Sequence, residues 1–211
     1  MLLAILVFQP GFFFKSSAMK LIQSVVAIII GVILLAGCSE GEEKKVLVMA
    51  SGKVQIKDNV INLEPGTTHT ENEVVVTNGK LTVSTPSGSS DFSVPETGLY
   101  ILNIKKDTLV GSYQRIGTDN SQEVISQENL KTRIDSLNQL MAGSNATAAN
   151  RNYFILPDQL VKVSANTGAQ IIGPYKRVPA SFEGGKKHEI YKFYTNKEMR
   201  EIVDKLNKMI Q

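Results

Sequence analysis

Between residues 46 and 116 the chain repeats one pattern, in which short runs of valine, leucine and isoleucine are separated by glycine, proline, asparagine and aspartate. Strands that recur about every 8–12 residues, with turn signals between them, are typical of an antiparallel sandwich or barrel. We therefore predict an antiparallel β module over residues 46–116. Turns are expected at Asp58-Asn59, at Pro65-Gly66 as a type II turn, and at Pro86-Ser87-Gly88.

The strongest local signal in this segment is Asn78-Gly79, which separates β-rich runs at residues 73–77 and 80–84. Asn-Gly favours a type I′ turn, because that turn needs a positive φ at both central residues. We therefore predict a hairpin in which these two runs pair. Because side chains alternate between the faces of a strand, Val75 points to one face. The opposite face is predicted to be apolar and to hold Val74, Val76, Leu81 and Val83.

Beyond a predicted linker at residues 117–121, the spacing of the apolar positions changes to that of a helix. Positions i, i+4, i+7 and i+11 form one stripe, which consists of Leu130, Ile134, Leu137 and Met141. Ser126 suits the N-cap of this helix and Gly143 suits its C-terminal end. The sequence therefore predicts a helix that starts after Ser126.

Four further strands are predicted at residues 153–156, 160–163, 169–172 and 189–194. A second helix follows, because Thr195 and Glu198 match a capping box and an apolar stripe continues to Ile210. Such a stripe must be covered, so we expect this helix to lie on the sheet made by residues 153–194. Residues 126–211 are thus predicted to form an α+β module. The whole fold is predicted to be mostly β with an α+β C-terminal half.

The N-terminal segment has a different pattern. Met19-Lys20 precedes a mostly apolar run at residues 21–34, which is followed by Leu35-Ala36-Gly37-Cys38. A positive charge, a short apolar core and small residues before a cysteine resemble the signal peptide and lipobox of bacterial lipoproteins. The resemblance implies that residues 1–37 are a signal peptide cleaved before Cys38. It also implies that Cys38 is the lipidation site, with a diacylglycerol on its thiol and fatty acyl chains such as palmitate.

A transmembrane helix is the alternative interpretation of this segment. A membrane span needs about 20 mostly apolar residues, and residues 21–37 supply 17. A lipid anchor also accounts for the chain's single cysteine, which a membrane span does not require. Residues 1–18 are interpreted as an over-extended start, with translation beginning at Met19.

Residues 38–45 are polar and charged, which is typical of a flexible tether. In bacterial lipoproteins, the family that this segment resembles, a serine after the cysteine usually implies sorting to the outer membrane. In some of their lineages, acidic residues close to the cysteine accompany export to the cell surface. Ser39 matches the first feature, and Glu40, Glu42 and Glu43 match the second, although a plain solvated spacer has the same composition. We expect a lipid-anchored cell-envelope protein in the outer membrane, with its periplasmic or surface exposure left open.

The chain that remains after removal of the predicted signal peptide is nearly neutral and contains few residues that bind metals. Without residues 1–37, which carry Lys15 and Lys20 and no acidic residue, the net charge falls from +3 to +1. Nucleic-acid binding needs clustered cations, so it is not expected. His69 and His188 lie in different halves of the chain and are interpreted as surface or turn residues. With one cysteine beside them, the usual zinc sites are excluded, and no cofactor or metal is predicted.

Aromatic residues gather in the second half, at Tyr153, Phe154, Tyr175, Tyr191, Phe193 and Tyr194. Several of them are expected to fill the core under the last helix. Tyr175 and its two basic neighbours lie between prolines, which indicates an edge strand or an ordered loop. The candidate contacts for a partner or ligand are therefore Tyr175, Lys176, Arg177 and Tyr153.

Three functions remain open. The first is non-catalytic binding or assembly, with the membrane as one partner through the lipid and an envelope protein or polymer as another. The second is hydrolysis of an envelope polymer by paired carboxylates, but no pair can be named, and Ser89-Ser90-Asp91 lacks the G-x-S-x-G elbow. The third is a small-ligand receptor with an apolar pocket of about a few hundred Å³ and Tyr175 or Tyr153 on its wall.

No catalytic residue is assigned, so an enzyme is less expected than a binding protein. Residues 191–209 are similar to the tails of uncharacterised envelope lipoproteins. This second resemblance implies no activity.

Overall fold

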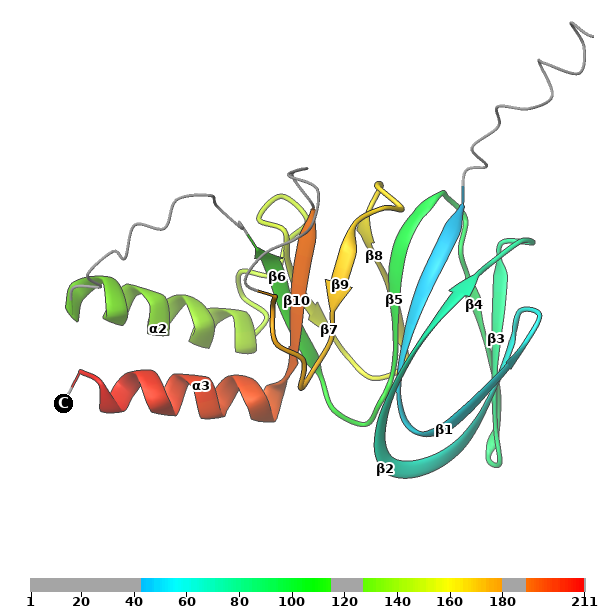
Figure 1. Cartoon of the computed structure of the whole chain (residues 1–211), viewed down its shortest axis with the longest axis horizontal. Coiled ribbons are helices and arrows are strands. Elements are labelled where there is room, and N and C mark those ends of the chain that lie inside the picture. Colours follow the sequence, from blue (N-terminus) through cyan, green and yellow to red (C-terminus); the bar gives the residue numbers. More distant parts are fainter. Residues whose placement is uncertain (1–42, 115–126, 180–188, 211) are drawn as a thin grey trace, which may run out of the picture. The chain divides into compact units, whose positions relative to one another are not determined.

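The computed structural model of the chain describes residues 43–114, 127–179 and 189–210 (Figure 1). It is 50% strand and 19% helix, which confirms the prediction of a mostly β fold. The strands form a nearly closed, barrel-like six-stranded sheet and a second, four-stranded sheet, with two helices beside the latter. The described residues fall within one compact unit, Glu42–Gln211.

The six-stranded sheet has the strand order β4-β3-β2-β1-β5-β8. Its strands are β1 (Lys44–Lys57), β2 (Val60–Val75), β3 (Lys80–Thr85), β4 (Gly88–Ser93), β5 (Gly98–Ile104) and β8 (Gln159–Ser164). The four-stranded sheet has the order β7-β6-β10-β9. Its strands are β6 (Leu109–Gln114), β7 (Asn152–Ile155), β9 (Gln170–Ile172) and β10 (Ile190–Thr195).

The long β1–β2 hairpin organises the first sheet. Its two-residue loop is Asp58-Asn59, as predicted, and Asp58 adopts a φ of 54°. Period-two alternation along both strands sends apolar side chains to the inside of the curled sheet. The core there includes Val46, Val48 and Ile61, all fully buried.

The hairpin predicted at Asn78-Gly79 does not form, but the prediction of which side chains are buried is confirmed. Gly79 has a positive φ of 70° but Asn78 does not, so no type I′ turn forms. The end of β2 pairs instead with β1, and β3 runs parallel to the start of β2. Yet the four side chains of the predicted apolar face are all buried, whereas Val75 is 47% exposed. The alternation of apolar and polar residues determines which side chains are buried. The end of β2 pairs with the long strand β1 instead of with β3, its neighbour in the sequence.

Pro65-Gly66 also departs from its prediction, because it lies inside β2 and Gly66 lacks the positive φ of a type II turn. The register slips here, from Ser51 opposite His69 to Gly52 opposite Pro65. Proline cannot donate to the ladder, so its place in a strand is at a bulge or an edge. Irregular pairing of this kind bends a strand pair and increases its twist, which suits a sheet that curls.

The expected antiparallel module is in fact a mixed sheet, because β1 runs parallel to β5 and β2 parallel to β3. Strands also cross between the two segments distinguished in the sequence. β8, from the second segment, pairs with β5, and β6, from the first, lies between β7 and β10 in the four-stranded sheet. A shared core joins the sheets, with Met49 and Ile101 from one and Ile155 and Phe193 from the other.

Both predicted helices are present as α2 (Gln127–Met141) and α3 (Asn196–Lys208), and they lie side by side next to the four-stranded sheet (Figure 1). The capping box of α3 is confirmed, with the Thr195 hydroxyl accepting from the Glu198 backbone N–H at 3.1 Å. Met199, in the first turn of α3, packs against Val110 of β6 and Leu140 of α2. In the described part of the chain, no helix has the length and apolar character needed to cross a membrane.

Candidate functional site

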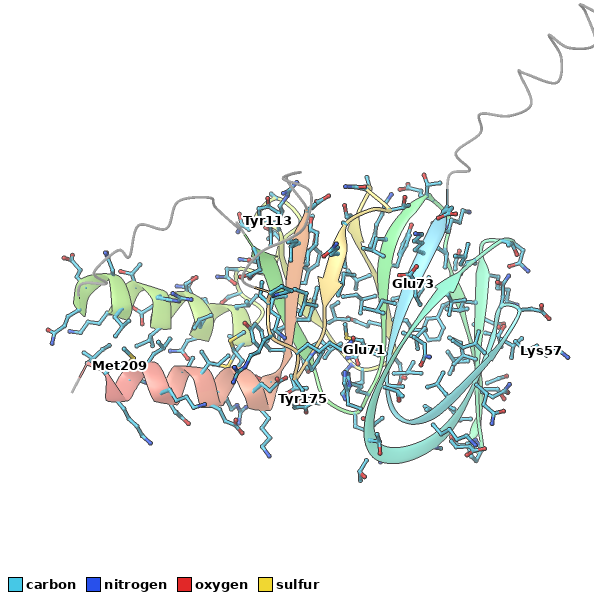
Figure 2. All side chains as sticks on the ribbon, viewed as in Figure 1. Lys57, Glu71, Glu73, Tyr113, Tyr175 and Met209 are labelled. Atoms are coloured by element: carbon cyan, nitrogen blue, oxygen red, sulfur yellow. The ribbon has the colours of Figure 1, made fainter. Side chains whose placement is uncertain are left out.

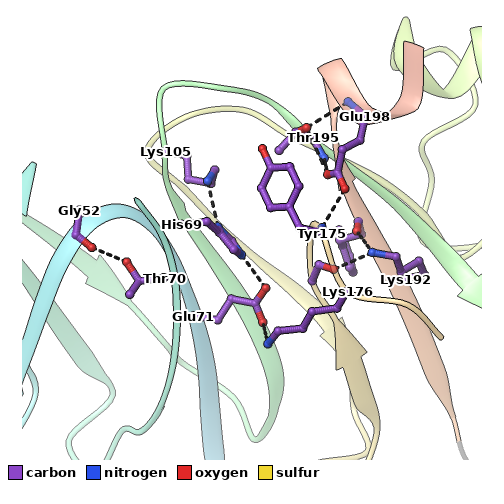
Figure 3. Close-up of polar contacts among 12 residues, drawn as sticks. Gly52, His69, Thr70, Glu71, Lys105, Tyr175, Lys176, Lys192, Thr195 and Glu198 are labelled. Atoms are coloured by element: carbon purple, nitrogen blue, oxygen red, sulfur yellow. Dashed lines mark hydrogen bonds and ion pairs between the residues drawn. The ribbon is translucent and has the colours of Figure 1, made fainter. Parts of the chain in front are cut away.

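Side chains from both sheets and from α3 hold the segment of residues 173–177, which follows β9 and is called the 173–177 loop below (Figure 3). The Lys192 ammonium of β10 donates to the Gly173 carbonyl at 2.6 Å. The Tyr175 backbone N–H donates to Glu198 Oε1 of α3 at 2.8 Å. Lys176 Nζ pairs with Glu71 Oε2 of β2 at 2.5 Å. Three charged side chains from separate elements therefore fix this loop.

Tyr175 occupies an unusual backbone conformation, with a φ of 65°. A non-glycine residue in the left-handed region costs about 1–2 kcal/mol, and such strain persists only where the surroundings impose it. Here the loop contacts impose it, and they leave the Tyr175 side chain 63% exposed. The ring meets His69 edge-on, with 5.4 Å between ring centroids. The result is an exposed aromatic ring on a rigid base.

A chain of polar contacts runs beneath this ring (Figure 3). Lys105 Nζ lies 3.0 Å from His69 Nδ1, and His69 Nε2 lies 2.6 Å from Glu71 Oε1. An ammonium group can only donate, so Nδ1 accepts and Nε2 carries the proton given to Glu71. The other carboxylate oxygen of Glu71 receives Lys176. We refer to these four residues as the Lys105–Lys176 relay.

Two lysines near the loop are buried. Lys192 is 3% exposed, and burial lowers its pKa to about 8 against the opposing effect of Glu198 and Glu71. Its ammonium also lies 4.3 Å from the centroid of the Tyr194 ring. Lys105 is 7% exposed, and burial likewise lowers its pKa, with Asp107 as the largest opposing charge. A buried ammonium group loses its hydration, and this cost must be offset by hydrogen-bond acceptors, aromatic rings or anions nearby.

The cavities on the described surface include one in the six-stranded sheet and one beside β9. The larger, of about 820 Å³, lies in the six-stranded sheet near its bulge and includes Lys105 in its wall. The smaller, of about 280 Å³, lies between β1 and the β9 region and includes Leu47 and Ile171. Neither has Tyr175 or Tyr153 on its wall, and each has one acidic residue, Asp158 or Glu73. These two cavities therefore lack the tyrosine wall that the receptor hypothesis requires. They also lack the pair of carboxylates that the hydrolase hypothesis requires.

The four predicted contact residues separate in the structure. Tyr175 and Lys176 meet His69 and Glu71, and Arg177 is exposed beside them in the chain. Tyr153 is instead buried in the core between the sheets, where its hydroxyl donates to the Val163 carbonyl at 2.6 Å. Cys38 and His188 lie outside the described residues.

The sequence analysis missed most of the relay. His69 was interpreted as a surface or turn residue, but it lies within β2 with its side chain 16% exposed. Lys105, Lys192 and Glu71 carried no signal of their own, because the residues that meet here span positions 69–198. Only the pair of prolines around Tyr175 pointed to the loop.

Comparisons with family models, with curated proteins and with solved structures found no match to this chain. Within residues 43–114, 127–179 and 189–210, no group of three or more His, Cys, Asp or Glu side chains is arranged to hold a metal ion. The carboxylates at the site, Glu71 and Glu198, are each engaged by lysine, histidine or backbone donors.

Proposed function

We propose that this chain is a lipid-anchored cell-envelope protein with a non-catalytic binding role, and that the 173–177 loop contacts its partner. The observation that carries the binding role is Tyr175, an exposed aromatic residue held in a strained conformation by contacts from three elements. Strain of this kind points from structure towards function.

The anchor is supported by the sequence alone. Leu35-Ala36-Gly37-Cys38 resembles a lipobox, and residues 38–43 are polar enough to act as a tether. The tether predicted for residues 38–45 is two residues too long, because Lys44 and Lys45 belong to β1. Several acyl chains together give stable membrane attachment, because each buried methylene contributes about 0.8 kcal/mol. The outer membrane is the proposed location, since Ser39 follows the cysteine.

The chemistry of the loop indicates the kind of partner. Tyrosine and arginine are enriched among the residues that dominate binding energy at protein interfaces. Tyr175 and Arg177 are both exposed, and the Lys176 side chain between them is 59% exposed. Because the anchoring contacts are already made, little conformational entropy remains to be lost on binding. An envelope protein with an acidic pocket for an aromatic ring fits these features.

The anchor is tested with Cys38→Ser and with Ser39→Ala as the matched control. In cells fed an alkyne-labelled fatty acid, the unchanged protein and the Ser39→Ala control should be labelled and membrane-bound. Cys38→Ser should lose the label and keep residues 1–37, as intact mass would show. Equal labelling of Cys38→Ser would overturn the anchor.

The binding role is tested by photo-crosslinking. p-Benzoylphenylalanine replaces Tyr175 in one protein and Met209 in the control, because Met209 is exposed at the far end of α3 (Figure 2). Irradiated cells should give one discrete adduct from position 175 and not from position 209. The adduct should disappear when Arg177→Glu is added. A position-175 adduct that matches the control, or one that survives Arg177→Glu, would contradict the proposal.

A further inference from the structure

We propose that the open edge of β4 and the cavity of about 820 Å³ beside it bind an extended segment of a partner protein, with apolar residues at alternate positions. The segment pairs with β4 as an added strand and places those residues in the cavity. This inference goes beyond the lipid anchor and the 173–177 loop. It depends on neither, because it uses no side chain of the loop or of the relay.

The cavity borders both terminal strands of the nearly closed six-stranded sheet, β4 and β8. Its wall includes residues of β4 together with Pro157 and Asp158, which directly precede β8. At the other ends of these strands, Lys162 of β8 pairs with Glu96, which follows β4, at 2.6 Å. The seam between the two strands is therefore bridged at one end, and the cavity occupies the other.

Half of the backbone hydrogen-bonding groups of β4 face away from the sheet. β4 pairs with β3 on one side, and among the described strands none pairs with its other side. The Val94 backbone N–H, just past β4, donates to the Gly79 carbonyl, just before β3, at 2.8 Å. Backbone groups alternate in direction along a strand, so those that face outward belong to Ser89, Asp91 and Ser93. An added strand would pair with these groups.

β4 also lacks the features that usually protect an edge strand. Natural edges are blocked by lysine, proline, bulges or covering segments. β4 contains neither lysine nor proline, its register with β3 is unbroken from Gly88 to Ser93, and five of its six residues are exposed. Its one charged residue, Asp91, pairs with Lys80 of β3 at 2.9 Å. An unprotected edge of this kind is a template for pairing with another chain.

The cavity offers apolar surface where the inward side chains of an added strand would lie. Ser90 and Phe92 point to the buried face of β4, because Ser90 lies opposite Val83, which is 4% exposed. The wall continues inward with the buried side chains of Leu63 and Ile104. Side chains alternate between the faces of a strand, so every second residue of the added strand enters the cavity. Pockets for alternate side chains give specificity when a peptide binds by strand addition.

The charge of the cavity wall favours uncharged side chains. Its charged residues are Lys105, Lys106 and Asp158. The Lys105 ammonium donates to His69, which is not part of the wall, and the exposed Lys106 and Asp158 carry opposite charges. A neutral wall selects against a charged inward side chain, which would lose its hydration without gaining a partner. The β4 edge of a second copy fits less well, because Phe92 is the one large apolar residue of that strand.

The test uses the full-length protein purified in detergent and fluorescence anisotropy with labelled synthetic peptides. The probe has six alternating valine and threonine residues, to match the six residues of β4, between terminal lysines that keep it soluble. One control peptide has its valines in a single block, and the other is the probe with N-methyl groups on all amides of the alternating run. The probe should bind at least about tenfold more tightly than either control, because each control loses the equivalent of two or more backbone hydrogen bonds.

Three variants locate the binding. Ser89→Pro removes an outward-facing N–H, whereas its matched control Ser89→Ala keeps it. Ser90→Trp fills the cavity from the inward face of β4. Ser89→Ala should bind the probe normally, and the other two should bind at least about tenfold more weakly. Circular dichroism checks that each variant folds, and Ser90→Trp decides the result if the proline variant does not.

Three outcomes would overturn the inference. The first is equal binding of either control peptide, and the second is unchanged binding by Ser90→Trp. The third is a dimer in sedimentation that Ser89→Pro dissociates, because the edge would then belong to a second copy. None of these outcomes would alter the labelling at Cys38 or the crosslink at position 175.

Discussion

A rise in pH from about 7 to about 9.5 should stabilise the fold through Lys192. Burial lowers the pKa of Lys192 from its ordinary value of 10.5 to about 8, with Glu198 and Glu71 opposing the change and Lys176 adding to it. At neutral pH the ammonium is charged in the folded and the unfolded chain, so folding bears the cost of burying it. Between pH 8 and 10.5 the folded chain has released this proton while the unfolded chain keeps it, so stability rises with pH.

The size of this effect follows from the pKa difference of about 2.5 between the two states, which corresponds to about 3 kcal/mol. By about pH 9.5, roughly 2 kcal/mol of this should be recovered, because the unfolded chain has only begun to deprotonate. The neutral amine keeps two N–H groups. These suffice for its bonds to the carbonyls of Gly173 and Phe193, so the loop should stay in place.

The assay is urea unfolding at both pH values for the unchanged protein, for Lys192→Met and for Lys197→Met. Lys197 is an exposed lysine on α3 and serves as the control. Burial also lowers the pKa of Lys105, but Lys105 has no contact with Lys192 or Lys197, so its effect is the same in all three proteins and cancels in the comparison. The unchanged protein and Lys197→Met should gain about 2 kcal/mol more than Lys192→Met. Equal gains in all three would refute burial as the origin of the lowered pKa.

Three further changes test other parts of the fold by urea unfolding. Gly52→Ala should lower the free energy of unfolding by roughly 3 kcal/mol. The reason is that Gly52 has a φ of 127° and a Cβ there would lie 2.1 Å from the Glu64 carbonyl oxygen. An unchanged urea midpoint would mean that the bulge tolerates a side chain. Thr195→Ala should lower the free energy of unfolding by about 1 kcal/mol through loss of the α3 cap. An unchanged free energy of unfolding would show that water replaces the Thr195 hydroxyl at the cap. Tyr153→Phe should also lower it by about 1 kcal/mol, since its hydroxyl bonds the Val163 carbonyl, and it should leave crosslinking at position 175 intact; a lost crosslink would contradict its assignment to the core.

The elements themselves were largely predictable because their signals are local. Period-two alternation identified the buried face of residues 74–83, and the capping box located the start of α3 within a few residues of sequence. The pairing of strands was less predictable. Asn78-Gly79 is a strong hairpin cue, yet β1 offers β2 a partner along nearly its whole length, which outweighs one short turn.

The relay was beyond the reach of sequence analysis for a related reason. Its residues lie on β2, after β5 and after β9, and no fixed spacing joins them. A buried lysine is recognisable only once its neighbours are known, because the same residue type is usually exposed. Tyr175 and Lys176 could be named in advance because flanking prolines indicate an ordered loop, whereas Tyr153 shared the aromatic character but proved to be core.

By itself, the sequence determined which side chains must leave water, where helices begin, and that residues 35–38 resemble a lipidation signal, since each depends on residues close together in the chain. Only the tertiary structure decided that β6 and β8 each join the sheet of the other segment, and that Lys105, His69, Glu71 and Lys176 meet beneath Tyr175. Strand pairing and burial of charge depend on contacts between distant residues. Such contacts exist only when the whole chain has packed around its shared core.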